Sequence, residues 1–421
     1  MSGEIWKPDF PTETVMEGNV KLIVPKLESF VKSRSDYAPS KAPVFYNPVM
    51  EFNRDLAVLA LQAYQRTVNH EITVCELLAG CGAMGIRFAA EVKGVKKVVM
   101  ADINERASKL ARQNIELNNL IGRVTVEHEE ANLLLSRCGA PHERFDVIDI
   151  DPFGSPVRYL DSAIRALRNH GLLAVTATDM APLCGVHSKA CIRKYGGKPL
   201  RTEYCHELAV RLLAGCLASA AARHDMGVEV VFSHSSDHYV RVYAIIKYGA
   251  KKADASIRNL GFVMHCFNCL HREASREALT DGCVKCSECG SKMSYAGPLW
   301  LGRISDAPFC VLMKGESQQR LLRLGERIEG LLASVEKESE TLISYYVIDE
   351  LCHILGLPVP SVKRVVEALK KEGFSAFLTH FDSRGIRSNV PAMMMGSILR
   401  GMAKEKRQVL NNLGSKHVLH R

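Results

Sequence analysis

The sequence predicts an α/β chain built on a doubly wound, Rossmann-like sheet, followed by a cysteine-rich segment and a mixed α/β C-terminal domain. Three observations carry this prediction. Between about residues 50 and 250, strand-like segments alternate with helix-like ones, the order expected of a parallel sheet with helices on both faces. Five cysteines then gather between Cys266 and Cys289. Beyond them the chain becomes largely helical.

The expected strands of the sheet are short apolar runs, and the expected helices between them are rich in good helix formers. The strands are 71–78, 96–104, 123–132, 145–154, 171–180, 228–236 and 239–248. The helices are 86–93, 106–119, 161–170 and 202–223. Only a short turn joins the last two strands, which predicts an antiparallel hairpin at one edge of the sheet.

The C-terminal part shows two amphipathic helices, 344–356 and 361–373, separated by Leu-Pro-Val-Pro. The segment 376–381 is expected to be a strand after them. This order is typical of a small winged-helix-like unit. The basic tail, 401–421, is expected to be partly mobile.

Length, composition and charge limit the possible classes of protein. A chain of 421 residues suggests two or three domains, and we expect them to be 1–262, 263–295 and 296–421. Hydrophobic residues make up 47% and charged residues 24%, as in globular proteins. The chain has no long apolar run and starts without a signal region, so we expect it to be cytoplasmic, with no membrane segment. The excess of 55 Lys and Arg over 46 Asp and Glu favours a polyanionic partner.

A glycine-rich turn follows the first expected strand. Gly80, Gly82 and Gly85 stand between that strand and a helix, where glycines let the backbone approach a ligand and aim the helix N-terminus at it. Such a turn alone would fit a dinucleotide enzyme equally well.

Acidic residues end the next two strands. Asp102 follows the turn at the spacing where a carboxylate accepts both ribose hydroxyl protons, although it could also cap the next helix. The third strand reaches Glu129 and Glu130, where an acid can accept a hydrogen bond from an adenine amine. Two acids at successive strand ends favour an adenosine ligand.

The fourth strand ends in Asp151-Pro152-Phe153-Gly154. An acid, a proline and an aromatic at this place form a pattern used for methylating planar amines. Asp151 can accept the hydrogen of a weakly nucleophilic amine, Pro152 fixes the backbone, and Phe153 offers a face on which an extruded base can stack. On their own, Asp151 could be a turn residue and Phe153 a core residue. Asp149, two residues earlier on the same side of the strand, is expected to hold a neighbouring arginine or amide.

Two Cys-x-x-Cys turns lie in the cysteine-rich segment. Cys266 with Cys269, and Cys286 with Cys289, are separated by sixteen residues. Paired turns of this kind supply four thiolates, which is the preferred set for structural zinc. Rival ligands are Cys283, His265 and His271. Because four protein ligands leave no open position, we expect a structural metal and no catalytic one.

These motifs together resemble the tRNA (guanine-26, N2)-dimethyltransferases, particularly their archaeal branch. The resemblance runs through EGNVKLIV, FYNPVMEFNRDLAV, DIDPFGSP, TATDMAPLCG, YGGKPLRTEYCHELAVRLL, DHYVRVY, the Cys-x-x-Cys pairs, GPLWLG and THFDSRGIRSNVP. It implies a class I methyltransferase domain with S-adenosyl-L-methionine as donor. It further implies transfer of one and then a second methyl group to N2 of guanine 26 in tRNA, with Asp151 as the catalytic acid.

The resemblance also implies cofactor-binding residues. Arg54 in FNRD is similar to the arginine that contacts the methionine carboxylate of the cofactor. Asp102 matches the ribose-binding acid, and Glu130 with Ala131 falls where the family usually carries Asp-Ala at the adenine. The glycine turn departs from the family form, so Arg87 is either an arginine near the cofactor or a residue of the helix surface.

A tRNA substrate requires basic contacts for its phosphates, and no obligate protein partner is evident. Candidates are Arg193, Lys194, Lys198 and Arg201 in one loop, and Lys363, Arg364, Lys370 and Lys371 on a late helix. Two other functions stay open: an amino methyltransferase acting on DNA adenine or a different RNA base, and a zinc-containing nucleic-acid-binding protein without activity.

Overall fold

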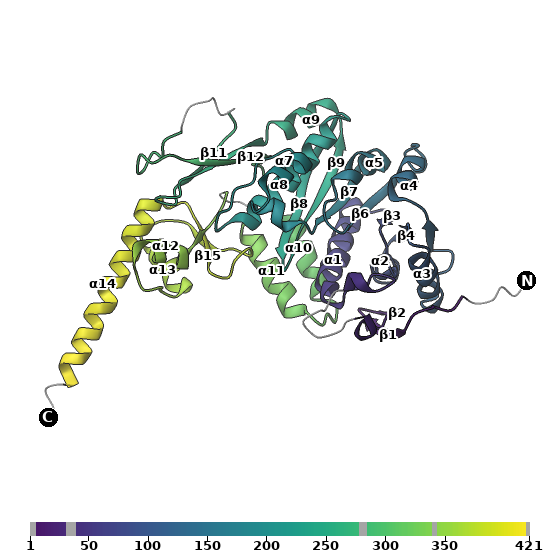
Figure 1. Ribbon diagram of the computed structural model, residues 1–421, viewed down its shortest axis with the longest axis horizontal. Coiled ribbons are helices and arrows are strands. Elements are labelled where there is room, and N and C mark those ends of the chain that lie inside the picture. The colour runs from purple at the N-terminus through teal and green to yellow at the C-terminus, as the bar shows by residue number, and fades with distance from the viewer. Residues whose placement is uncertain (1–5, 31–38, 278–283, 339–342, 418–421) are drawn as a thin grey trace, which may run out of the picture.

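The computed structural model describes residues 6–30, 39–277, 284–338 and 343–417. At its centre lies a seven-stranded sheet with the strand order β5-β4-β3-β6-β7-β9-β8 (Figure 1). Neighbouring strands from β5 to β7 are parallel, whereas β9 is antiparallel to both of its neighbours. The strands are β3 (Ile72–Leu77), β4 (Val95–Asp102), β5 (Val124–His128), β6 (Phe145–Ile150), β7 (Leu167–Ala177), β8 (Met226–Ser236) and β9 (Tyr239–Tyr248). The predicted parallel sheet with an antiparallel hairpin edge is therefore confirmed.

Helices cover both faces of this sheet, and a separate apolar core lies between the sheet and the helices on each face. One face carries α1 (Glu51–Val68), α2 (Ala83–Glu91) and α3 (Glu105–Leu117). The other face carries α4 (Ala131–Arg137), α5 (Leu160–Ala166) and α8 (Cys205–Ala222). Helix α8 is long and apolar enough to cross a membrane by length and composition, but 72% of it is buried inside the protein. The strand order reverses direction between β3 and β6, and in sheets of this type ligands bind in the crevice at that point.

An N-terminal hairpin, β1 (Thr12–Glu17) and β2 (Val20–Pro25), lies beside the sheet domain. Asn114 on α3 fixes it, because its side chain accepts from Ile23 N at 2.6 Å and donates to Ile23 O at 2.9 Å. This hairpin was not expected from the sequence. It brings Glu17 against α1 and α2.

Two helices that follow the cysteine-rich segment also belong to the sheet domain. Helices α10 (Ala307–Ser317) and α11 (Gly325–Glu338) share the apolar core of α1. Their buried side chains include Phe309 on α10 and Ile328 on α11. Part of the expected domain 296–421 thus packs against the central sheet.

A second, three-stranded sheet joins the sheet domain to the cysteine-rich segment. Its order is β11-β10-β12, with β10 (Leu260–His265) in the centre, β11 (Arg272–Ser275) on one side and β12 (Ser294–Trp300) on the other. Because β12 also packs on α8, the two cysteine turns are attached to the core of the domain.

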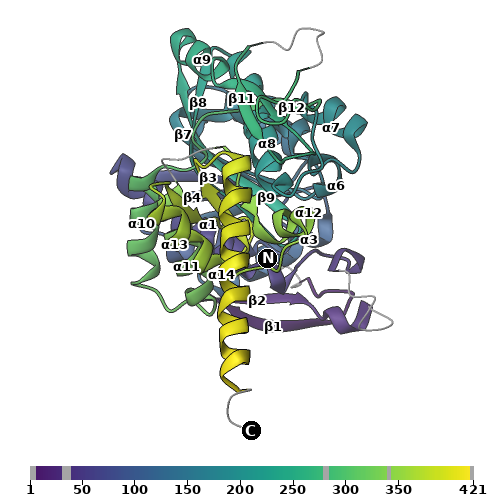
Figure 2. The same ribbon diagram turned by 90° about the vertical axis from the view of Figure 1, so that its left-hand side faces the viewer.

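The C-terminal unit has a separate apolar core, and Figure 2 shows its helices on the side that faces the viewer. Its elements are β13 (Tyr346–Val347), α12 (Ile348–Leu355), α13 (Val362–Lys371), β14 (Ala376–Leu378), β15 (Gly385–Ser388) and α14 (Ala392–His417). The strands form an antiparallel sheet in the order β13-β15-β14. Figure 1 shows α14 projecting from the body of the molecule towards the C-terminus.

Two expected helix boundaries were wrong. The helix expected over 344–356 starts at Ile348, because Tyr346 and Val347 pair with β15. The helix expected over 161–170 ends at Ala166, and β7 begins at Leu167 by pairing with β6. In both places strand pairing outweighs local helix preference. Within the tail 401–421, the chain is helical up to His417.

Candidate active site and metal centre

The glycine turn lies at the carboxyl end of β3, as expected. Gly80 has φ +56°, and a Cβ atom there would lie 2.8 Å from the carbonyl oxygen of Phe45. Only glycine fits such a backbone and such an approach. The Gly80 amide donates to Asp102 Oδ2 at 2.8 Å, so the turn and the end of β4 are held together.

Asp102 ends β4 with both carboxylate oxygens facing backbone amides. Its Oδ1 atom accepts from Asn104 N at 2.8 Å, and Asn104 itself caps α3. The alternative that Asp102 is the cap of this helix is therefore wrong. Burial raises the pKa of Asp102, and the amides of Asn104 and Gly80 oppose that rise.

A buried acid that the sequence analysis missed supports the same turn. Glu76 on β3 accepts from the Gly85 amide at 2.8 Å, and a Cβ atom on Gly85 would lie 2.5 Å from Glu76 Oε2. Gly82 has φ +82° and stands at the start of α2. The available signal was an acidic residue inside an otherwise apolar strand.

Glu130 and Ala131 follow β5 at the same edge of the sheet. The Glu130 side chain caps α4, accepting from Asn132 N at 2.8 Å and Leu133 N at 3.1 Å. Ala131 is buried at the first position of this helix. The structure therefore gives the Glu130 carboxylate a capping role.

Asp151 directly follows β6, and its side chain is 28% exposed. Asn53 Nδ2 on α1 donates to Asp151 Oδ2 at 3.2 Å. Burial raises the pKa of the Asp151 carboxyl, while the charge of Arg241 lowers it in part. A partly exposed carboxylate thus stands at the carboxyl end of β6, with one oxygen bound by an amide.

Behind Asp151 lies a buried ion pair. Asp149 is 2% exposed and pairs with Arg241 on β9, which is fully buried. This confirms the expectation that Asp149 holds a neighbouring arginine. Arg241 itself was not expected from the sequence, although a charged residue within the apolar strand β9 was a usable signal.

Phe153 is an exposed aromatic residue, not a core residue. It is 67% exposed, and its ring meets Phe45 edge-on with centroids 4.5 Å apart. Pro152 beside it is buried. The Gly154 amide donates to Thr178 Oγ1 at 2.6 Å, which fixes the loop after β6 to the loop after β7.

Arg54 lies on α1 and is only 6% exposed. Its Nε and Nη2 atoms lie 2.5 and 2.6 Å from the two carboxylate oxygens of Glu17. Tyr46 also donates to Glu17, at 2.9 Å. The structure thus places Arg54 in an ion pair with the N-terminal hairpin.

Arg87 on α2 is fully buried, so its alternative as a residue of the helix surface is wrong. Three carboxylates surround its guanidinium: Glu91 at 2.8 Å, Asp55 at 2.7 Å and Glu17 at 3.1 Å. Arg87 and Arg54 therefore share Glu17, a residue that the sequence analysis did not single out.

The four cysteines of the two turns converge. All of their sulfur atoms lie within 4.8 Å of one another, and the closest pairs, Cys266–Cys289 and Cys269–Cys286, are 3.5 Å apart. Around a zinc ion with bonds of about 2.3 Å, tetrahedral sulfur ligands lie about 3.8 Å apart. The donor set and its spacing fit that ion.

The rival histidines do not belong to the converging group of ligand atoms. His265 Nδ1 lies 3.1 Å from Tyr204 OH, and His271 Nδ1 lies 2.6 Å from Glu288 Oε1. Cys283 lies outside the described residues. Glu288 further accepts from the amides of Ala392 and Met393 at 3.1 and 2.7 Å, so the second cysteine turn caps α14.

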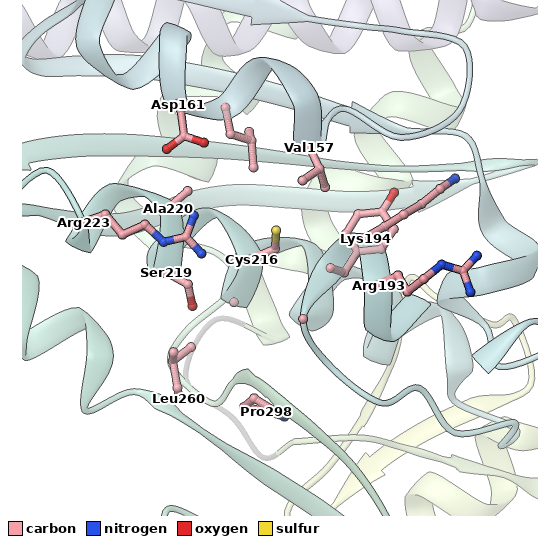
Figure 3. A pocket seen from close by; sticks show the side chains of 14 residues that line it. Val157, Asp161, Arg193, Lys194, Cys216, Ser219, Ala220, Arg223, Leu260 and Pro298 are labelled. Atoms are coloured by element: carbon pink, nitrogen blue, oxygen red, sulfur yellow. The ribbon is translucent and has the colours of Figure 1, made fainter. Parts of the chain in front are cut away.

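A cavity of about 270 Å³ lies between α5, α8 and α7 (Ser188–Tyr195). Figure 3 shows Arg223 and Asp161 on one side and Arg193 and Lys194 on the other. Lys194 also pairs with Asp179 at 2.9 Å. The remaining basic candidates are spread out: Lys198 lies over the Tyr295 ring, and Arg201, Lys363, Arg364, Lys370 and Lys371 are exposed.

The fold and the site define a class of protein. A seven-stranded sheet with one antiparallel strand next to its edge, and acids at the ends of β4 and β6, is the architecture of Rossmann-like methyltransferases. The chain belongs to the family of N2,N2-dimethylguanosine tRNA methyltransferases, whose family model matches residues 18–400. The resemblance given by the sequence motifs is thus confirmed.

Individual relatives agree over almost the whole chain. The tRNA (guanine(26)-N(2))-dimethyltransferase of Methanobrevibacter smithii is 40% identical over 395 residues, covering 94% of this chain and 99% of the relative. That of Methanothermobacter thermautotrophicus is 41% identical over 392 residues, covering 93% and 100%. The structure of Trm1 from Pyrococcus horikoshii with S-adenosyl-L-methionine is similar with a TM-score of 0.80 and 32% identity, covering 92% of this chain and 99% of that one.

Proposed function

We propose that this chain transfers methyl groups from S-adenosyl-L-methionine to the exocyclic N2 of guanine 26 in tRNA, first one and then a second. The observation that carries the proposal is the Asp151 carboxylate, which stands partly exposed at the end of β6. The glycine turn and Asp102 end the neighbouring strands β3 and β4. A methyl donor at those strands and an amine at Asp151 would meet at one edge of the sheet.

The chemistry needs an acceptor for a proton. The lone pair of N2 is delocalised into the guanine ring, so the amine attacks poorly unless its hydrogen is bound to a base. S-Adenosyl-L-methionine supplies a methyl group on a positively charged sulfur. As the N–C bond forms and the C–S bond breaks, the amine proton passes to the Asp151 carboxylate. A monomethylated amine keeps one hydrogen, so the same carboxylate serves the second transfer.

Phe153 and Pro152 hold the base in this proposal. An aromatic ring that is 67% exposed beside the acceptor offers a stacking surface to a flipped guanine. The buried Pro152 fixes the backbone between Asp151 and Phe153. The bond from Gly154 to Thr178 limits movement of the same loop.

The cofactor residues act directly or through a neighbour. Asp102 and Gly80 bind the ribose side of the adenosine, and Ala131 offers its amide to the adenine. Glu130 positions that amide by capping α4. Arg54 binds the methionine carboxylate through donors that Glu17 leaves free.

Arg87 has a supporting part in this scheme. Because it is buried and paired with three carboxylates, it positions Glu17, and through Glu17 it positions Arg54. We therefore assign Arg87 to the support of the cofactor site and not to a direct contact.

We further propose a structural zinc ion held by Cys266, Cys269, Cys286 and Cys289. The sulfur spacing and the all-thiolate donor set support it. The ion would fix the second cysteine turn, and with it the Glu288 carboxylate that caps α14.

The C-terminal unit is proposed to be a winged-helix-like domain that binds tRNA. The order of one strand, two helices and two strands around an antiparallel sheet supports this assignment. With helices α10 and α11 packed in the sheet domain, we place the independent part of the domain 296–421 from about residue 344 onwards. Candidate phosphate contacts are the exposed basic residues of α13 in this unit and the cations around the cavity in the sheet domain.

The reaction is tested with unmodified tRNA transcripts that carry guanine or adenine at position 26 and labelled S-adenosyl-L-methionine. We expect label only in the guanine transcript, recovered as N2-methylguanosine at early times and N2,N2-dimethylguanosine at late times. Label in neither transcript, with the cofactor still bound, would point to a different base or nucleic acid and overturn the proposal.

A further inference from the structure

Arg241 is a buried cation that lies close to Asp151 but donates no hydrogen bond to it. Arg241 Nη2 pairs with Asp149, and Nη1 donates to Thr176 Oγ1 at 2.5 Å. Arg241 Nε donates to Tyr243 OH at 2.8 Å. The Nη1 atom lies 4.0 Å from Asp151 Oδ2, which exceeds a hydrogen-bond distance. Arg241 therefore acts on Asp151 through its charge and through Thr176, whose hydroxyl accepts from Arg241 and also hydrogen-bonds Asp151.

We propose that Asp149 and Arg241 are positioning residues that set the strength of Asp151 as proton acceptor. Arg241 keeps Asp151 in the carboxylate form, and Asp149 holds Arg241 away so that Asp151 keeps its lone pairs for the guanine amine. The inference rests on the proposed function, because it assigns these roles in a transfer that Asp151 serves.

Removing either partner should shift the pKa of Asp151 in a predictable direction. Without Arg241, two carboxylates on the same side of β6 would face each other in a buried place, which favours protonation. Without Asp149, the Arg241 guanidinium would lose its partner, and its nearest remaining carboxylate is Asp151. A charge-assisted bond from that guanidinium would make Asp151 a weaker base.

The other polar groups near Asp151 come from α1, β3, β7 and β9. Thr176 on β7 and Asn53 on α1 hydrogen-bond it, and the charge of Arg54 favours its ionised form. Glu76 on β3, and Tyr239 and Tyr243 on β9, are also close enough to sense its charge. These residues are themselves unchanged in both variants, and Thr176 and Tyr243, which accept from Arg241, lose that donor only in Arg241→Gln.

The pKa of Asp151 predicts in which direction the pH dependence of the transfer rate should shift. Burial raises this pKa, and the charge of Arg241 lowers it. Because transfer needs the carboxylate, the rate is lost as pH falls through this pKa. Removal of Arg241 should therefore move the acidic limb of the rate profile to higher pH, and removal of Asp149 should move it to lower pH.

The test is single-turnover methyl transfer to the guanine-26 transcript, measured against pH at saturating S-adenosyl-L-methionine. For Arg241→Gln we expect the acidic limb to shift up by about one unit or more, the size of an opposite charge at this range. For Asp149→Asn we expect a downward shift with a plateau rate several-fold lower. The double variant Asp149→Asn/Arg241→Gln should lie between the two, close to the unchanged protein.

A matched control lies on the same strand. Asp146 at the start of β6 is 3% exposed and pairs with Arg168 at 2.7 Å, but it lies at the opposite end from Asp151. Asp146→Asn should lower thermal stability and leave the rate profile in place. A profile that moves as it does for Asp149→Asn would show a general effect of losing a buried charge.

Two outcomes distinguish failure of this inference from failure of the proposed function. The inference is wrong, and the function stands, if the unchanged protein methylates the transcript but the acidic limbs of the pH–rate profiles of Arg241→Gln and Asp149→Asn do not shift or shift in the same direction. If the unchanged protein methylates nothing, the proposed function itself fails. Should Arg241→Gln not fold, the double variant, which removes both charges together, and Asp149→Asn still decide.

Discussion

Arg54 and Glu17 form a two-pronged ion pair that ties the N-terminal hairpin to the first helix of the sheet domain. Two guanidinium nitrogens of Arg54 lie 2.5 and 2.6 Å from the two oxygens of Glu17, and both side chains are almost inaccessible to solvent. Arg87 reaches the same carboxylate from α2 at 3.1 Å. One acid of the hairpin thus balances two buried cations next to the expected cofactor site.

Glu17→Gln should destabilise the protein. The substitution leaves two buried arginines without part of their counter-charge, and breaking a buried ion pair costs about 3–5 kcal/mol. Burial raises the pKa of Glu17, but Arg54 and Arg87 lower it below its ordinary value. The carboxylate therefore stabilises the fold above the ordinary Glu pKa, and this contribution is lost as pH falls through the lowered value.

The free energy of unfolding in denaturant, compared at neutral and acidic pH, measures this effect. Glu13→Gln, on an exposed position of the same hairpin, is the control and should change little. Equal stability of Glu17→Gln and the unchanged protein at neutral pH would contradict the account.

Arg54→Lys should weaken binding of S-adenosyl-L-methionine by about tenfold or more. A lysine lacks the planar, forked donor group that could bond Glu17 and the methionine carboxylate of the cofactor at the same time. Calorimetric titration measures the affinity. The loss should disappear with 5′-methylthioadenosine, which has no methionine carboxylate. An equal loss for both ligands would show that Arg54 only supports the fold; Arg66→Lys, on the same helix, is the control.

Phe153→Ala should lower methyl transfer to the guanine-26 transcript about tenfold or more, since stacking on an aromatic side chain contributes about 1–3 kcal/mol per base. Affinity for the cofactor should not change, because the ring is exposed at the loop after β6. Phe267→Ala removes another exposed aromatic residue, on the first cysteine turn, and serves as the control. An unchanged transfer rate would remove Phe153 from the proposed base site.

Purified protein should contain one equivalent of zinc by elemental analysis, and Cys269→Ser should lose it. Because Glu288 of the second cysteine turn caps α14, metal loss should also speed hydrogen exchange at the amides of Ala392 and Met393. Cys216→Ser, on α8, is the control and should retain the metal. Zinc retained by Cys269→Ser, or metal loss without faster exchange at α14, would contradict this coupling.

Much of the central domain could be predicted because its signals are local. Apolar runs of strand length, a glycine turn and acids at strand ends gave the parallel sheet and brought Gly80 to Asp102. The cysteine turns were equally visible, since their spacing alone selects the four sulfur atoms that converge.

The rest depended on contacts between distant parts of the chain. Nothing near Glu17 in the sequence announces that it meets Arg54 and Arg87, which follow it by 37 and 70 residues. Arg241 reaches Asp149 only because β9 enters the sheet two strands away from β6. Helix ends at Ala166 and Ile348 were misplaced for the same reason, because strand pairing with distant partners set them.

The most direct test of the central claim is Asp151→Asn, assayed for single-turnover transfer to the guanine-26 transcript alongside calorimetric titration of S-adenosyl-L-methionine. The amide keeps the shape of the side chain but cannot take a proton. We predict that transfer falls about 100-fold or more, as for the loss of a general base, while cofactor affinity stays nearly constant. Unchanged transfer, or an equal loss of cofactor binding, would contradict the assignment of Asp151 as the acceptor for the guanine amine.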